Sequence, residues 1–385
     1  MAEWKHVKIG DVCTVERGGS PRPIDKFITD DPNGINWIKI GDTTDSMYIT
    51  ETAQKIIPEG MKKSRYVQPG DFLLSNSMSF GRPYILKIDG CIHDGWLVLR
   101  DKDGIFDKRF LYYYLSSPST YQKFKNMAVG GVVNNLNSEM VRGVTVPVPT
   151  MEEQLDIVST LDKVTELITL RKEQLAKLDR LVKSRFIELF GDPVYNNNGL
   201  PTKKLRELGS LDRGRSQHRP RNDPKLLNGP YPLIQTGEVA SAGLYITEYK
   251  NTYSELGLQQ SKMWKAGTLC ITIAANIAQT AILTFDACFP DSVVGFVPND
   301  AVSAIYMHYW FGFFQKILEE QAPQVAQKNI NLKILSDLDV MVPKKEHQEQ
   351  FAAFVDQTDK SKLAIQKSLD KLELLKKSLM QQYFG

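Results

Sequence analysis

The chain has 385 residues, 42% of them hydrophobic, which exceeds the usual size of one domain and can furnish two ordinary cores. Its 48 lysines and arginines barely exceed its 45 aspartates and glutamates, so the net charge of +3 neither shows nor excludes a nucleic-acid partner. The four cysteines have no CxxC spacing, which argues against a zinc site or disulfide framework, and the lack of a signal core or of about 18 successive apolar residues predicts a soluble, cytoplasmic protein without a membrane partner.

The sequence is an internal repeat of two copies, each about half the chain. Residues 148–163 align with 342–357 at an offset of 194 residues, whereas 8–23 pairs with 204–220 at a slightly larger offset. Insertions therefore fall in the globular parts, while the segments that end each copy align without gaps. This pattern predicts two mixed α/β (α+β) domains at 1–150 and 192–343, each followed by a long helix, at 151–191 and 344–385.

The first domain carries basic residues in glycine- or serine-containing stretches, where they suit contacts to DNA phosphates. These candidates are Arg17, Arg22, Lys39, Lys62, Lys63, Arg65 and Arg82. Polar residues that follow the strand-like run at 72–74 could hydrogen-bond to base edges, and these are Asn76, Ser77 and Ser79. For each of these three, the alternative is a turn that caps the strand.

Two aspartates, Asp94 and Asp291, stand at equivalent positions of the two copies. They could indicate a carboxylate metal site, but no E-x-K partner follows at nuclease spacing, so a turn or a structural hydrogen bond is favoured. The five histidines are far apart and show no HExxH spacing. We therefore predict no metal site.

Residues 151–190 lack proline and glycine and are predicted to form one helix, a rod of roughly 60 Å at about 1.5 Å per residue. Thr150 and Glu153 have the spacing of a capping box, and Gly191 follows where a helix should end. Apolar residues recur with the alternating four- and three-residue spacing of a coiled-coil seam, at Ile157, Leu161, Val164, Ile168, Leu175, Leu178, Val182 and Leu189.

The second domain opens with the densest basic run outside the helices, at 213–221, where a solvated loop without a partner is the alternative to DNA contact. Its candidates are Arg213, Arg215, Gln217, His218, Arg219 and Arg221. Asn276 and Gln279 follow the strand-like run at 269–273 and could read bases. The loops at 130–135 and 324–329, the latter with Gln327 and Lys328, are a second choice for DNA contact.

The second helix shows the same seam, although Lys344 stands where the first copy has the capping threonine. Its seam residues are Phe351, Val355, Ile365, Leu369, Leu372, Leu379 and Tyr383. Some seam positions are polar in one helix and apolar in the other: Arg171 and Arg185 match Ile365 and Leu379, and Lys362 and Lys376 match Ile168 and Val182. Such mismatches could fix the register of a pair within one chain, or the long side chains could simply reach solvent at the seam edge.

Motifs of a methyltransferase or nucleotide-binding enzyme are missing from the sequence. It has no glycine-rich cofactor loop, no Asn-Pro-Pro-aromatic run, no GxGxxG and no GxxxxGK[ST]. We therefore assign no catalytic residue and no cofactor to this chain.

The features that recur at half-chain offset are N-(L/I)-N at 135–137 and 329–331, then V-P, then E-x-Q opening a long helix that ends in F-G. With the opening W-K-x-V-K-I-G-D and the following R-G-G-S-P-R-P, this order resembles the specificity subunit (HsdS) of Type I restriction-modification systems. The resemblance covers essentially the whole chain.

The resemblance implies that each globular domain reads one half of a bipartite, asymmetric site in double-stranded DNA, and that the two helices pack antiparallel and set the spacing. It implies two HsdM modification subunits, which use S-adenosylmethionine to methylate adenine, and HsdR restriction subunits, which use ATP and Mg. A multidomain enzyme with an unrecognised active site, and a DNA-binding scaffold or regulator unconnected with modification, are the competing interpretations.

Overall fold

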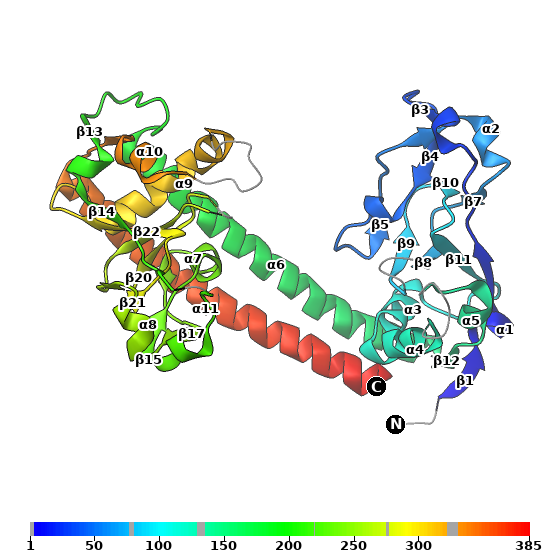
Figure 1. Cartoon of the computed structure of the whole chain (residues 1–385). Helices are drawn as coiled ribbons and strands as arrows, with labels where there is room; N and C mark the ends of the chain where they lie inside the picture. The colour runs from blue at the N-terminus through cyan, green and yellow to red at the C-terminus, as the bar shows by residue number, and fades with distance from the viewer. Residues whose placement is uncertain (1–3, 77–80, 129–134, 219, 275–276, 322–329) are drawn as a thin grey trace. The chain divides into compact units, whose positions relative to one another are not determined.

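The structure is a computed structural model, and it describes residues 4–76, 81–128, 135–218, 220–274, 277–321 and 330–385 (Figure 1). Its chain packing separates two compact units. The first unit contains residues 1–172 and 367–385, and the second contains residues 173–366. Both unit boundaries fall inside the long helices rather than at their ends.

The first unit contains short strands and helices ahead of the long helix α6 (Met151–Phe190). Its strands are β1 (Lys5–Lys8), β2 (Cys13–Arg17), β3 (Ile28–Thr29), β4 (Ile35–Ile38), β5 (Tyr48–Ile49), β6 (Lys55–Ile56), β7 (Arg65–Val67), β8 (Phe72–Ser75), β9 (Pro83–Leu86), β10 (Gly90–Ile92), β11 (Trp96–Asp101) and β12 (Thr145–Val148). Its helices are α1 (Ile9–Val12), α2 (Pro58–Met61), α3 (Lys108–Leu115), α4 (Pro118–Ala128) and α5 (Ser138–Arg142).

The second unit repeats this plan ahead of the long helix α11 (Lys345–Phe384). Its strands are β13 (Thr202–Lys204), β14 (Gly209–Arg213), β15 (Leu227–Leu233), β16 (Tyr245–Ile246), β17 (Asn251–Tyr253), β18 (Met263–Trp264), β19 (Leu269–Thr272), β20 (Thr280–Leu283), β21 (Ala287–Cys288), β22 (Val293–Pro298) and β23 (Asp339–Met341). Its shorter helices are α7 (Thr236–Ser241), α8 (Glu255–Gln259), α9 (Ala304–Gln321) and α10 (Leu332–Ser336).

The main sheets of the two units have the same topology. The first has the order β2-β11-β8-β9-β5 and the second the order β14-β22-β19-β20-β16, with three antiparallel pairings and then a parallel one. The register is also shared, because Leu97 lies opposite Arg17 in the first sheet and Val294 opposite Arg213 in the second. The α/β fold class is therefore confirmed, and the two copies share one architecture.

The second sheets differ. The first unit has the order β3-β6-β4-β10-β7, and the second has β17-β15-β21-β18. In the second unit the single strand β15 takes the places of both β3 and β4, because Leu227 and Tyr231 lie opposite Tyr253 as Ile28 and Ile35 lie opposite Ile56. In the first unit β10 pairs parallel with β4 and antiparallel with β7, and in the second β21 pairs parallel with β15 and antiparallel with β18. This difference lies in the region where the offset between the two copies changes along the sequence.

The two predicted long helices are confirmed at Met151–Phe190 and Lys345–Phe384, green and red in Figure 1. The start of α6 has the predicted capping box, because Glu153 accepts from the Thr150 backbone N–H at 2.8 Å and its own N–H reaches Thr150 Oγ1 at 3.3 Å. The start of α6 and the end of α11 share the core of the first unit. The end of α6 and the start of α11 share the core of the second.

The helices run antiparallel within each unit. In the first, Lys172 Nζ lies 3.3 Å from Glu373 Oε1, while Leu161 packs in the same cluster as Met380. In the second, Lys362 Nζ lies 2.7 Å from Asp179 Oδ1. All predicted seam residues are buried or half-buried.

The beginning of each long helix is joined to its globular region by a buried glutamine. Gln154 Oε1 accepts from the backbone N–H of Asp107 at 2.9 Å, and its Nε2 donates to the carbonyl oxygens of Ile105 and Pro149 at 3.0 and 3.1 Å. Gln348 makes the matching bonds to Ser303, Ala301 and Pro343 at 2.9, 2.9 and 3.0 Å. These are the glutamines of the E-x-Q signature, which therefore fix how each helix leaves its sheet.

All four cysteines are buried and unbridged. In the described part of the chain, no helix is both long and apolar enough to cross a membrane.

Candidate nucleic-acid interface

Four DNA-binding candidates of the first unit, Arg17, Arg22, Asn76 and Arg82, lie at one end of its main sheet. At this end β2 finishes at Arg17 and β8 at Ser75, while β9 begins at Pro83 and β11 at Trp96. The antiparallel pairing of these strands brings the loop after β2 and the hairpin between β8 and β9 together. We refer to this end, residues 17–22, 76, 81–82 and 93–95, as the first strand-end surface.

Asp94 lies at the centre of the first strand-end surface. Its carbonyl oxygen accepts from Arg17 Nε at 3.0 Å and from Asn76 Nδ2 at 2.9 Å. Its carboxylate accepts from Ser20 Oγ at 2.8 Å and lies 3.5 Å from Arg22 Nη2. The Ser20 hydrogen bond lowers the pKa of Asp94 below its ordinary value, so the carboxylate is charged at neutral pH.

The other basic candidates of the first unit differ in how far their charges are neutralised. Arg65 begins β7, where its Nη1 lies 2.8 Å from Glu16 Oε1 and its Nε donates to the Arg17 carbonyl. Lys39 Nζ donates to Gln54 Oε1 at 2.8 Å, and because this amide oxygen is uncharged, the contact does not neutralise the lysine. Lys62 and Lys63 follow α2 and are exposed. The paired charge of Arg65 makes it a weaker phosphate ligand than Arg17 or Lys62.

The two ends of the hairpin between β8 and β9 are joined by two hydrogen bonds between Ser75 and Arg82. The Arg82 N–H donates to Ser75 Oγ at 3.0 Å, and the Ser75 N–H donates to the Arg82 carbonyl at 3.0 Å. Asn76 is only 1% exposed, so the predicted base-reading amide instead joins the hairpin to Asp94. Ser77 and Ser79 lie outside the described residues. Arg82 is exposed, and in the described part of the chain its guanidinium has no acidic partner.

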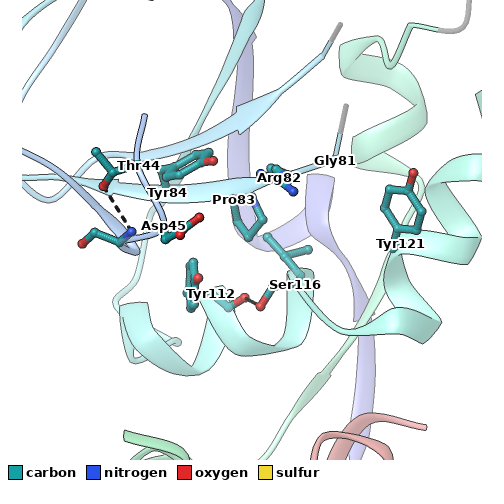
Figure 2. Close-up of a pocket in the computed structure, with 11 residues that line it drawn as sticks. Thr44, Asp45, Gly81, Arg82, Pro83, Tyr84, Tyr112, Ser116 and Tyr121 are labelled. Atoms are coloured by element: carbon teal, nitrogen blue, oxygen red, sulfur yellow. Dashed lines mark hydrogen bonds between the residues drawn. The ribbon is translucent and has the colours of Figure 1, made fainter. Parts of the chain in front are cut away.

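A polar pocket of about 490 Å³ opens beside Arg82 (Figure 2). Tyr84 and Arg82 line it from β9 and the hairpin, Tyr112 and Ser116 from α3 and its C-terminal cap, and Tyr121 from α4. Burial raises the pKa of Tyr112, so its hydroxyl stays protonated. The pocket therefore offers hydroxyl groups, one guanidinium and the carboxylate of Asp45 next to the hairpin.

The second unit has an equivalent strand-end surface, at residues 213–218, 220–221, 273–274, 277–279 and 290–292. Arg221 Nη2 lies 2.7 Å from Asp291 Oδ1, as Arg22 lies near Asp94 in the first unit. Arg213 and Arg215 are exposed. The paired aspartates are thus structural partners of the basic loops, as the sequence favoured, and the described residues include no group of three metal-ligating side chains.

Hydrogen bonds also hold the backbone of the loop after β14 between its two ends. Gln260 Oε1 accepts from the backbone N–H groups of Gln217 and His218 at 2.7 and 3.0 Å. His218 Nε2 lies 3.1 Å from Asp223 Oδ2, and Ser261 Oγ donates to the Arg215 carbonyl. The loop backbone is therefore fixed at these points, while the side chains of Arg213, Arg215 and Arg221 remain exposed.

The two hydrogen bonds that close the first hairpin recur in the second. The Gln279 N–H donates to Thr272 Oγ1 at 3.1 Å, and the Thr272 N–H donates to the Gln279 carbonyl at 2.9 Å. Gln279 thus takes the place of Arg82, and it lines a pocket of about 550 Å³ with Thr280 and His308. Thr280 Oγ1 lies 3.0 Å from His308 Nδ1.

The remaining DNA-binding candidates lie outside the described residues. They are Arg219, Asn276, Gln327 and Lys328, with most of the loop at 130–135 and all of that at 324–329. The sequence favoured a structural hydrogen bond or turn for Asp94 and Asp291 but did not identify the basic loops as their partners. Their equivalent repeat positions were the available signal.

Comparison with known proteins gives a consistent result for both copies. A family model described as the Type I restriction modification DNA specificity domain matches residues 1–180 and 197–376. The chain is 25% identical to the Type I restriction enzyme MjaIX specificity subunit of Methanocaldococcus jannaschii, over 68% of this chain but only 63% of that protein. It is 22% identical to the putative type I restriction enzyme MjaX specificity subunit of the same organism, over 98% of this chain and 92% of that protein.

Two solved structures share the fold. One is a chain from a structure described as the structural basis of complex assembly and conformational transition of the type I R-M system. It has a TM-score of 0.63 at 18% identity, and the match covers 100% of this chain and 98% of that chain. The other is the S subunit of a Type-I restriction-modification system from M. genitalium, with a TM-score of 0.58 at 14% identity, covering 100% and 96%.

Proposed function

The chain belongs to the family of Type I restriction-modification DNA specificity subunits, and we propose that its two strand-end surfaces each read one half of a bipartite DNA site. The observation that carries this proposal is the repetition of one basic surface on the same sheet end in both units. Exposed arginines there can contact phosphates, and the hairpin positions Arg82 and Gln279 can contact bases.

Catalysis is assigned to partner subunits. Support comes from the sequence, which lacks a cofactor loop, and from the family, which is that of specificity subunits. We propose that two HsdM subunits bring S-adenosylmethionine and that HsdR subunits bring ATP and Mg. A DNA-binding scaffold unconnected with modification is not favoured, because the family match covers both copies.

The long helices offer a surface for the modification subunits. Their solvent face carries leucines that are 43 to 68% exposed: Leu167, Leu170 and Leu181 on α6, and Leu363, Leu374 and Leu375 on α11. Exposed apolar side chains gathered on one element are typical of a protein interface. Changing Leu167 and Leu170 together to asparagine is expected to prevent co-purification with HsdM, whereas changing the neighbouring exposed Lys163 and Glu166 to asparagine should not.

Methylation mapping tests the proposed function. The chain is co-expressed with its modification subunit, and methylated adenines are located by single-molecule sequencing of the host genome. We expect one motif of two half-sites separated by a fixed gap, and no methylation from either subunit alone. Methylation by the isolated chain, or a motif that does not depend on it, would contradict the proposal.

The helices are further proposed to set the gap between half-sites. Inserting seven residues in each, after Leu170 and after Ala364, preserves the heptad seam and adds about 10 Å of helical rise. The gap should lengthen by about three base pairs, at 3.4 Å per pair, while the half-site bases stay the same. Changed bases with an unchanged gap would show that the helices do not determine the spacing.

A further inference from the structure

The basic loop of each unit is attached at its start by a glycine packed against backbone. A Cβ on Gly18 would lie 2.1 Å from the His93 carbonyl oxygen, and one on Gly214 would lie 2.2 Å from the Phe289 carbonyl oxygen. The Gly18 N–H donates to the Trp96 carbonyl at 2.9 Å, and the Gly214 N–H donates to the Val293 carbonyl at 2.9 Å. The first attachment is therefore the same in both copies.

The second attachment of each loop is an arginine held by an aspartate. Arg22 reaches Asp94 at 3.5 Å, and Arg221 reaches Asp291 at 2.7 Å. Four residues separate the two attachments in the first loop and seven in the second, counting to the arginine. Loops of different length and sequence thus close on the same two supports.

These ion pairs are too exposed to contribute much to folding stability, so stability does not explain why both copies have one. The Arg22 side chain is 83% exposed and that of Asp94 is 42% exposed. Ion pairs in such surroundings contribute little to folding, because solvent screens the charges and holding two side chains costs entropy. The pair nevertheless recurs at the same place in both copies, on the face proposed to meet DNA.

A carboxylate is also an unfavourable group to place beside DNA phosphates, since like charges repel. Asp94 has a second role that offsets this repulsion, because it joins the basic loop to the reading hairpin. Its carboxylate accepts from Ser20 of the loop, and its carbonyl oxygen accepts from Asn76 of the hairpin. One residue therefore sets the position of both DNA-facing segments.

We propose that Asp94 and Asp291 are positioning residues for DNA reading, which close each basic loop onto its sheet so that its exposed arginines face a half-site. These are Arg22 in the first unit, and Arg215 and Arg221 in the second. This inference rests on the proposed function. It predicts that the two aspartates strengthen specific binding, although their negative charge by itself repels DNA phosphates. The lowered pKa of Asp94 is consistent with this, because the carboxylate remains charged over the whole physiological range.

The test compares Asp94→Asn and Asp291→Asn with matched removals of a negative charge, Asp25→Asn and Asp300→Asn, at exposed positions in the same units. Each variant is assembled with the modification subunit. Binding is measured to a duplex that carries the mapped site and to a scrambled duplex of the same composition. Thermal unfolding checks that each variant is folded.

Asp94→Asn and Asp291→Asn should each weaken binding to the site duplex on the order of tenfold, the size of one lost interface contact. Binding to the scrambled duplex should be unchanged or tighter, because a negative charge is gone. The control variants should not weaken binding to either duplex. If Asp94→Asn binds the site duplex as well as the controls do, the positioning role is wrong.

Ser20→Ala is the second variant, for the case in which Asp94→Asn does not fold. It removes the hydrogen bond between loop and carboxylate without changing the charge. It should lower the preference for the site duplex by about tenfold, in line with one hydrogen bond to a charged group, and an unchanged preference would overturn the proposal. A wild-type assembly that does not distinguish the two duplexes would instead contradict the proposed function itself.

Discussion

The basic loops of the two globular regions begin and end on the same supports but differ in length and content. The first reads GGSPR from Gly18 to Arg22, and the second reads GRSQHRPR from Gly214 to Arg221. Around them, the sheet order, the hairpin hydrogen bonds and the buried glutamines coincide. The molecule thus keeps one frame twice and varies what the frame presents, which suits the proposed reading of two different half-sites.

The largest expected effect comes from breaking the shared frame. Gln154→Leu would leave the Asp107 N–H and the carbonyl oxygens of Ile105 and Pro149 without their partner in a buried place. Buried polar groups that lose their hydrogen bonds cost the most, so we expect a loss of about 2 to 4 kcal/mol in the free energy of unfolding. Urea unfolding followed by circular dichroism measures it.

Gln348→Leu is the matching change in the second copy and should cost about as much, because its three hydrogen bonds have nearly the same lengths. Gln350→Leu, at an exposed position of α11, serves as the control and should stay within about 0.5 kcal/mol of wild type. A large loss in only one of the two copies would show that the frames are not energetically equivalent.

The next effect concerns the charge that the second loop carries and the first lacks. Arg213 corresponds to Arg17, but Arg215 stands where the first copy has Gly19. Arg213→Ala with Arg215→Ala should lower the slope of log affinity against log salt by about two units, and Arg17→Ala by about one. At fixed salt the pair should cost about 2 kcal/mol of binding free energy.

These slopes are measured by fluorescence anisotropy on a labelled duplex with the mapped site. Lys250→Ala, an exposed change elsewhere in the second unit, should leave the slope as it is. Equal slopes for wild type and the Arg213, Arg215 variant would remove this loop from the interface.

A smaller effect separates the pockets beside the two hairpins. Burial lowers the pKa of His308 to about 4, whereas the equivalent position in the first copy is Tyr112. The unfolded chain, with an ordinary histidine pKa near 6.5, takes up the proton more readily. The contribution of His308 is therefore fully present above about pH 6.5 and is lost as the pH falls toward 4.

Between pH 6.5 and 5.5 this should remove about 1 kcal/mol from the free energy of unfolding of wild type. His308→Gln keeps a hydrogen-bonding group near Thr280 but cannot titrate in this range, so its unfolding free energy should change less over the same interval. Parallel pH profiles for the two proteins would show that His308 does not titrate with unfolding.

The sequence predicted the long helices well and the contact surface only in part, for a physical reason. A helix of 40 residues repeats its seam many times, and cap signals mark its ends, so local pattern determines it. Asn76 shows the opposite case. Its polar side chain after a strand indicated base contact, but its burial depends on Asp94, which is distant in the sequence and becomes its neighbour only through strand pairing.

The smallest expected effect concerns a seam position that is lysine in one helix and isoleucine in the other. Lys362 corresponds to Ile168, and it makes an ion pair with Asp179 at 2.7 Å. If that pair fixed the register, Lys362→Ile should destabilise the helix pair. However, Asp179 is 61% exposed, so the pair contributes little, and the packing of Phe186 against Phe351 already fixes the register at that end.

We therefore expect Lys362→Ile to raise the free energy of unfolding by about 0.5 kcal/mol, because isoleucine adds buried apolar area to the seam. The mapped gap between half-sites should keep one length. Asp179→Asn, which removes the same ion pair and leaves the lysine in place, should change stability by less than about 0.5 kcal/mol. A loss above about 1 kcal/mol for Lys362→Ile, or two gap lengths in the methylation map, would show that the lysine selects the register and that the two helices owe their alignment to their differences.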